Sequence, residues 1–153
     1  MILTKPDISS VIPDNRRKLQ LAESWISKIR EDRQITYDVP ITHHFAEGVY
    51  AREGHIPKDT MFVGRVHLHS QINILSKGDV TVLTETGVQR YKAPCTWVAP
   101  KGVQRAAYTH EDTVWTTILG TNETDPEVIF DTYTAPNYED YLACTELLKI
   151  VEK

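Results

Sequence analysis

Two histidines, His67 and His69, are separated by one residue in a run rich in strand-forming residues. On a β-strand, residues two apart point to the same side, so an unbroken strand would align Arg65, Gln71 and Asn73 with both histidines. Imidazoles side by side on one face can hold a metal ion. They can equally be polar residues on the outer face of a strand, and the spacing alone does not decide between the two interpretations.

Composition excludes several classes of protein. The chain has 153 residues, 41% of them hydrophobic and 25% charged, which is typical of one soluble domain. A net charge of -4 gives no global basic field for nucleic acid, and no stretch is long and apolar enough to span a bilayer. The first residues lack the apolar core of a signal peptide, so we expect a cytoplasmic protein. Cys95 and Cys144 are far apart and are expected to be structural thiols.

A helix is predicted over residues 15–31, with Asp14 as its N-cap. Its apolar positions recur at helical spacing: Leu19, Ala22, Trp25, Ile26 and Ile29. This stripe needs a partner, which is either the outside of a sheet or a second subunit.

The middle of the chain reads as many short strands separated by Gly, Pro and Asp turns, a pattern typical of a sandwich or barrel. The expected strands are 35–39, 41–45, 48–53, 61–68, 70–76, 79–84, 88–92, 95–98, 103–109, 113–119 and 127–133.

The chain ends in a second predicted helix. Asn137 can cap it, and Tyr141, Cys144, Leu148 and Val151 form one apolar face. We therefore expect one folded domain of three segments: an N-terminal arm and helix over 1–34, a β-barrel over 35–134 and a C-terminal helix over 135–153.

The central run resembles the first motif of the cupin superfamily, in which a glycine precedes His-x-His, a glutamate follows and a glycine closes the next turn. Gly64, His67, His69 and Gly78 match this motif, whereas Gln71 stands at the glutamate position.

Residues 100–105 resemble the second cupin motif, Pro-x-Gly-x-x-His, followed four residues later by asparagine. Pro100 and Gly102 match, but Arg105 replaces the histidine and Thr109 replaces the asparagine. The resemblance covers residues 45–120, and it extends to small uncharacterised cupins of bacteriophage and bacterial genomes.

The resemblance implies a mainly β protein: a single-domain jelly-roll barrel with the site inside, often as a homodimer. It also implies a divalent metal, such as Fe, Mn, Ni or Zn, held by histidines and a glutamate. In this chain the tentative ligands would be His67, His69 and Gln71.

The departures from the motif act against a metal. Gln71 is uncharged, and Arg105 stays protonated and cannot ligate a cation. The same changes favour an anion, because an arginine presents a planar fork that matches carboxylate or phosphate. We therefore expect a pocket for a small anionic, sugar-like or nucleotide-like ligand. Its expected lining is His67, His69, Gln71, Asn73, Arg105 and Thr109.

Two other functions remain open at this point. The barrel can be a metal-dependent oxygenase, isomerase or lyase that uses His67 and His69. It can also be a scaffold or host-interaction protein that acts through Trp25 and Ile29 of its N-terminal helix.

The pocket itself has open alternatives too. Arg105 can instead turn away to pair with Glu111 or Asp112. One of the remaining histidines can supply a third metal ligand through space; these are His43, His44, His55 and His110.

Overall fold

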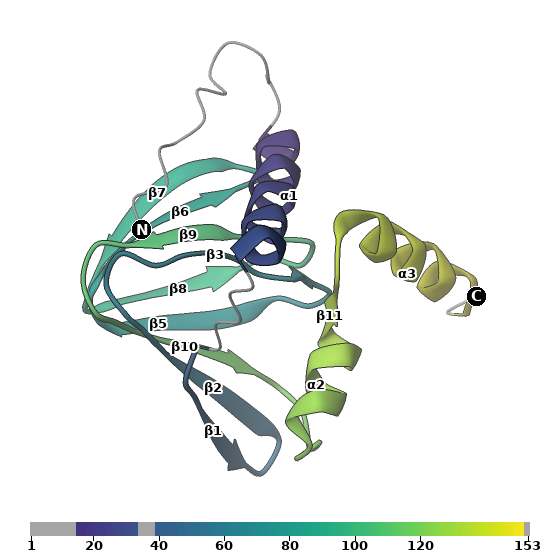
Figure 1. The fold of residues 1–153 in the computed structure, drawn as a ribbon. Helices are drawn as coiled ribbons and strands as arrows, with labels where there is room; N and C mark the ends of the chain where they lie inside the picture. The colour runs from purple at the N-terminus through teal and green to yellow at the C-terminus, as the bar shows by residue number, and fades with distance from the viewer. Residues whose placement is uncertain (1–14, 34–38, 152–153) are drawn as a thin grey trace.

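The computed structural model describes residues 15–33 and 39–151. Two antiparallel sheets dominate it (Figure 1). The five-stranded sheet has the order β1-β2-β10-β5-β8, the four-stranded sheet has the order β3-β9-β6-β7, and a small third sheet pairs β11 with β4. The strands are β1 Ile41–Ala46, β2 Val49–Ile56, β3 Met61–Val63, β4 Val66–His67, β5 Gln71–Lys77, β6 Asp79–Thr84, β7 Gly87–Lys92, β8 Cys95–Ala99, β9 Ala106–Thr109, β10 Thr113–Leu119 and β11 Thr134–Ala135.

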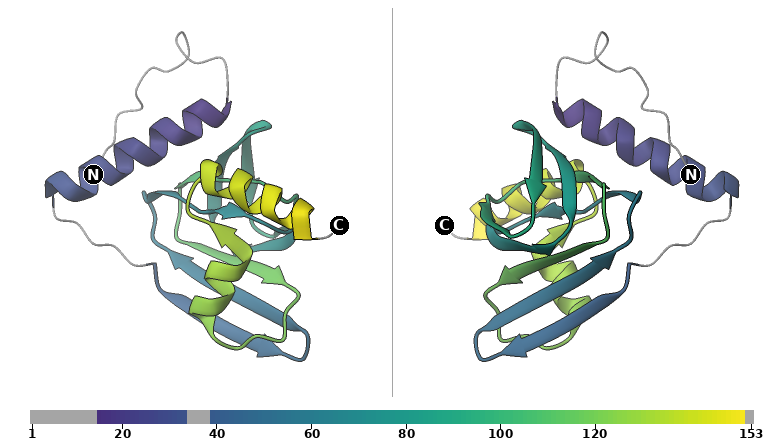
Figure 2. Two further views of the ribbon diagram at one scale, coloured as in Figure 1. Left: turned by 90° about the vertical axis from the view of Figure 1, so that its right-hand side faces the viewer. Right: turned by 90° about the vertical axis from the view of Figure 1, so that its left-hand side faces the viewer.

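The expected fold class is confirmed: the chain is mainly β, with a helix at each end. The helices are α1 Asn15–Arg33, α2 Pro126–Tyr133 and α3 Tyr138–Val151. α1 lies against β3, β6 and β9 of the four-stranded sheet, whereas α3 stands beyond the end of the barrel that carries β11 (Figures 1 and 2). None of the described helices is long and apolar enough to cross a membrane.

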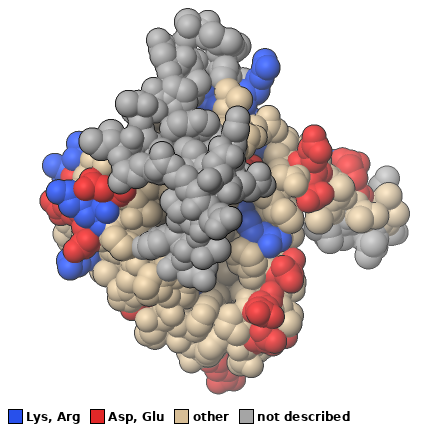
Figure 3. Space-filling model, in the orientation of Figure 1, with Lys and Arg blue, Asp and Glu red and all other residues tan. Residues whose placement is uncertain are grey.

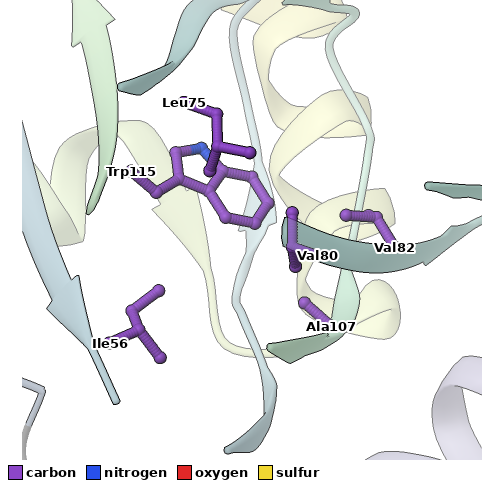
Figure 4. Close-up of a cluster of buried hydrophobic side chains, with 6 residues drawn as sticks. All are labelled: Ile56, Leu75, Val80, Val82, Ala107 and Trp115. Carbon is purple, nitrogen blue, oxygen red and sulfur yellow. The ribbon is translucent and has the colours of Figure 1, made fainter. Parts of the chain in front are cut away.

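The core lies between the two sheets, where strands alternate buried and exposed side chains. On β5, for example, Gln71, Asn73 and Leu75 are buried, whereas Ile72 is exposed. Trp115 of β10 lies within the central cluster (Figure 4). The cluster is drawn from both sheets and consists of Ile56, Leu75, Val80, Val82, Ala107 and Trp115.

The turn between β5 and β6 requires glycine. Gly78 has a φ of +104°, and a Cβ there would lie 2.7 Å from the Cα of Thr113. Only a residue without a side chain allows β5 to turn this closely past the start of β10.

α1 begins at Asn15 and carries a fully buried Leu19. The predicted cap Asp14 and the expected strand over 35–39, apart from residue 39, lie outside the described residues. The side chains of Trp25, Ile26 and Ile29 also lie outside them, so the predicted stripe is described only at its start.

Two predicted strands are wrong. The single strand expected over 61–68 is split into β3 and β4, because Gly64 N–H donates to the carbonyl of Arg105 and Leu68 N–H donates to that of Tyr133. The chain is thereby drawn from the four-stranded sheet towards β11.

The strand expected over 127–133 is the helix α2. Asp125 caps it by accepting from the backbone N–H of Glu127 at 3.0 Å, and Pro126 occupies the first turn. This start signal prevails over the β-branched pair Val128 and Ile129.

Charge is mixed on the outside of the molecule. On the face in Figure 3, Lys and Arg side chains alternate with acidic ones on one side, while acidic side chains gather over α2. No continuous basic surface is visible among the described residues of this face, which agrees with the net charge of -4.

Candidate functional site inside the barrel

Arg105 points into the barrel and is only 8% exposed. Its Nη2 donates to Nε2 of His67 at 2.9 Å, and its Nη1 donates to Oδ1 of Asn73 at 2.9 Å. Its guanidinium carbon lies 4.9 Å from the ring centroid of Trp115. The alternative in which Arg105 turns away to Glu111 or Asp112 is therefore wrong.

Asn73 lies at the centre of this hydrogen-bonded cluster. Its Oδ1 accepts three hydrogen bonds, from Arg105, from Nε1 of Trp115 at 3.0 Å and from Oγ1 of Thr117 at 3.1 Å. These donors determine the orientation of the amide, so its Nδ2 is the donor side. Nδ2 is buried and has no hydrogen-bond partner among the described residues.

Gln71 adds a second unsatisfied amide on the same face of β5. It is 4% exposed, and neither Oε1 nor Nε2 has a hydrogen-bond partner in the described part of the chain. Buried polar groups are nearly always paired, and leaving one unpaired costs about 1–3 kcal/mol. The unpaired Nδ2 of Asn73 and the unpaired amide of Gln71 on one strand face therefore indicate room for a polar guest.

His67 is held in its neutral form. Burial is the main cause that lowers the pKa of His67 to about 3, with the positive charges of Arg105 and Arg52 acting in the same direction. Because Arg105 can only donate, Nε2 of His67 accepts and the ring hydrogen resides on Nδ1. The nitrogen lone pair that faces the barrel interior is thus already engaged.

The charge of Arg105 has no acidic partner. No ion pair to a carboxylate of the described chain involves it, since its hydrogen bonds go to a neutral amide and a neutral imidazole. Burial lowers the pKa of Arg105 to about 10; the phenol of Tyr91 opposes this shift and the charge of Arg52 reinforces it. The guanidinium remains a cation at neutral pH, with two of its five N–H bonds used.

The other two predicted site residues lie elsewhere. His69 is exposed and packs edge-on against Tyr133 at 5.2 Å between ring centroids, because β4 ends at His67 and the face-sharing strand is interrupted. Thr109 is fully buried, and its Oγ1 donates to the carbonyl of Pro57 at 2.6 Å. This hydrogen bond holds the loop before β3 against β9. Neither His69 nor Thr109 therefore belongs to the Arg105 cluster.

The remaining histidines have partners outside the Arg105 cluster. His43 bonds the hydroxyl of Tyr50 and His110 bonds that of Thr81, both at 2.7 Å. His44 and His55 lie beside Glu53. None of these contacts leads to His67.

A divalent metal does not fit this set of donors. Within the described ranges, no group of three or more His, Cys, Asp or Glu side chains could hold a metal ion. Nε2 of His67 already accepts from Arg105, and His69 faces away. The tentative ligand set of His67, His69 and Gln71 is therefore not assembled.

A cavity of about 510 Å³ opens beside the cluster, and Arg105 is one of its lining residues. It lies between the β6–β7 hairpin, the loop that follows β8 and the first turn of α3. Four aromatic side chains line the cavity, and the motif comparison singles out none of them for the site. They are Tyr91, Trp97, Tyr138 and Tyr141. The alternation of side chains along β7 and β8 indicates that Tyr91 and Trp97 face inward. No local pattern predicts that Tyr138 and Tyr141 of α3 lie at this cavity.

The motif positions can now be placed on the fold. Gly64, His67 and Gly78 lie at the loop before β4, within β4 and at the turn after β5, and Arg105 enters the same interior from the loop before β9. The two facing antiparallel sheets enclose them. The chain has a cupin jelly-roll fold.

Solved structures similar to this cupin fold include several that are described as cupins. No protein-family model matches the chain, and no curated protein matches its sequence. A cupin-2 domain protein from Shewanella frigidimarina is 10% identical, with 61% of this chain and 92% of that chain covered and a TM-score of 0.47.

Two further similar structures come from other bacteria. KdgF from Halomonas sp. is 17% identical, with 61% of this chain and 93% of that chain covered and a TM-score of 0.49. Protein NMB1881 from Neisseria meningitidis is 14% identical, with 61% and 95% covered and a TM-score of 0.48.

Proposed function

We propose that this cupin binds a small anion inside its barrel, at Arg105, and that binding needs no divalent metal. The observation that carries the proposal is a buried guanidinium without a carboxylate partner among the described residues. Burying a charge without an opposite charge is costly, and proteins usually avoid it by pairing. An incoming anion supplies the missing charge.

The neighbours of Arg105 suit an anion better than a cation. Nδ2 of Asn73 and Nε2 of Gln71 are unpaired donors, and neutral His67 carries its hydrogen on Nδ1. Two unit charges about 4 Å apart at an effective dielectric of about 20 interact by about 4 kcal/mol. That attraction favours an anion at Arg105, and a divalent cation at the same place would be repelled about twice as strongly.

Titration calorimetry with inorganic phosphate and with acetate, at low salt, tests the proposal. We expect saturable binding of at least one of them to the wild type and at least a tenfold loss in Arg105→Met. Arg17→Met, which removes an exposed arginine of α1, is the matched control and should bind as the wild type does. Equal binding by all three proteins would overturn the proposal.

Metal content tests the second half of the proposal. The alternative function, a metal-dependent enzyme that uses His67 and His69, requires those two side chains to converge. We expect well below one equivalent of iron, manganese, nickel or zinc per chain after anaerobic purification. Near-stoichiometric metal that is lost in His67→Ala would instead support the enzyme.

We also propose that the cupin is a homodimer. A row of apolar side chains crosses the outer face of the five-stranded sheet, where Ile118, Ile72 and Val98 are Cα partners on β10, β5 and β8. Ile72 is 44% and Val98 68% exposed. An exposed apolar row of this kind is typical of an interaction surface, which supports a second copy covering it. The cytoplasmic location and the bacteriophage-like resemblance stay predictions.

A further inference from the structure

Two stacked aromatic pairs line the cavity beside Arg105. Tyr91 of β7 and Trp97 of β8 lie with ring centroids 4.1 Å apart and planes 12° apart. Tyr138 and Tyr141 of α3 lie 5.6 Å and 25° apart. The pairs belong to elements far apart in the chain, so one cavity receives aromatic surface from both the barrel and the C-terminal helix.

The buried residues of the cavity lining are apolar apart from Arg105. Val82, Ala99 and Val103 contribute to its lining together with Arg105. Arg105 lines the same cavity as the Tyr91–Trp97 pair. Burial is the main cause that raises the pKa of Tyr91, and the charge of Arg105 acts against that shift. The guanidinium carbon of Arg16 lies 3.0 Å from the ring centroid of Tyr138 and covers one face of that ring. A guest here therefore meets the remaining aromatic surface and the charge of Arg105 together.

The single acidic residue of the lining is already paired. Glu85 lies 3.4 Å from Nη2 of Arg16 and accepts from the backbone N–H of Gln104 at 3.1 Å. Lys101 is exposed and also lines the cavity. The cavity as a whole therefore favours a negatively charged guest.

We infer that the anion is an aromatic carboxylate whose ring occupies this cavity and whose carboxylate binds Arg105. The inference rests on the proposed anion site and names its ligand class. A flat ring gains by stacking on aromatic side chains, and an arginine fork matches a carboxylate. A volume of about 510 Å³ is enough for a small ring system of one or two fused rings.

A sugar acid fits these walls less well. Each hydroxyl of a sugar must find a hydrogen-bond partner when it leaves water, or it costs about 1–3 kcal/mol. The buried apolar side chains of the lining, Val82, Ala99 and Val103, offer no such partner, and the polar side chains of the lining are more exposed. The same reasoning makes an aromatic ring the better guest.

Competition binding to the full chain tests the inference, with 2-naphthoate followed by tryptophan fluorescence and benzoate, acetate and glucuronate as competitors. We expect 2-naphthoate and benzoate to bind at least tenfold more tightly than acetate or glucuronate. If acetate or glucuronate binds as tightly as the aromatic acids and binding still depends on Arg105, the ring site is overturned and the anion site stands. If no anion binds, both are overturned.

A pair of tyrosine variants provides a second measurement. Tyr141→Leu keeps an apolar side chain but removes a ring of the cavity, so we expect at least fivefold weaker 2-naphthoate binding and unchanged acetate binding. Tyr108→Leu, which removes a ring of β9 that contacts Asp59 and does not line the cavity, should leave both unchanged. Unchanged 2-naphthoate binding in Tyr141→Leu contradicts the inference, as does equal 2-naphthoate binding by Arg105→Met and the wild type.

Discussion

At the scale of single residues, Arg105 stands at the position where the second cupin motif has a histidine. Its Nη2 bonds His67, the one motif histidine that stays inside. The sequence was sufficient to predict that these two side chains and Asn73 meet. It was insufficient for His69 and Thr109, because their positions depend on where β4 ends and on a hydrogen bond to a distant loop.

Replacing Arg105 should stabilise the protein that holds no ligand. Arg105→Met removes a buried charge without an acidic partner. Oδ1 of Asn73 keeps its donors from Trp115 and Thr117, and only Nε2 of His67 loses its donor. We expect the free energy of unfolding to rise by about 1–2 kcal/mol, as is common when a binding residue is replaced by an apolar one. Urea unfolding measures it, and a loss of stability would show that Arg105 is chiefly structural.

His67 should make the fold sensitive to acid. Its pKa is about 3 in the folded chain and about 6.5 in an unfolded one. Between these values only the unfolded chain binds the proton, so the stabilising contribution present above pH 6.5 is progressively lost as the pH falls. We expect wild type to lose about 2–3 kcal/mol more than His67→Gln between pH 7 and pH 4.5.

The control for this pH effect is His69→Gln, which changes an exposed imidazole and should lose as much stability as the wild type. Urea unfolding of the three proteins at both pH values gives the comparison. Parallel losses in wild type and His67→Gln would mean that His67 takes up its proton in the folded chain.

At the scale of elements, most strands and both terminal helices could be predicted, because alternation and turn residues are local signals. The exceptions have nonlocal or competing causes. Leu68 leaves the predicted strand to bond Tyr133, which is 65 positions further along the chain. The β-branched pair Val128 and Ile129 favours a strand where α2 forms, whereas Asp125 and Pro126 carry a helix start signal.

The turn between β5 and β6 gives a prediction at this scale. Gly78→Ala must adopt a φ of +104° and also places a Cβ 2.7 Å from the Cα of Thr113, whereas Gly87→Ala has a similar backbone problem, φ +128°, with nothing within 4 Å. Backbone strain costs about 1–3 kcal/mol in both. We therefore expect Gly78→Ala to be clearly the less stable of the two, as measured by thermal unfolding; equal losses would contradict this.

At the scale of the whole molecule, the outer face of the five-stranded sheet determines the expected assembly. Ile72→Lys places a charge in the middle of the row that runs from Ile118 to Val98. If a second copy covers this row, sedimentation should show a monomer, because a buried unpaired lysine is not tolerated. Val128→Lys, at an equally 44% exposed position on α2, is the control and should sediment as the wild type does.

Asn73 has a consequence that extends beyond its own hydrogen bonds. Its Oδ1 already contacts Arg105 at 2.9 Å, and its NH₂ group has no acceptor in the described chain. Exchanging that NH₂ for an oxygen, as in Asn73→Asp, would install a permanent internal counter-ion beside the guanidinium. The carboxylate would neutralise the charge of Arg105, and an anionic ligand would no longer be attracted. The affinity of the barrel for an anion therefore depends on residue 73 being an amide and not a carboxylate.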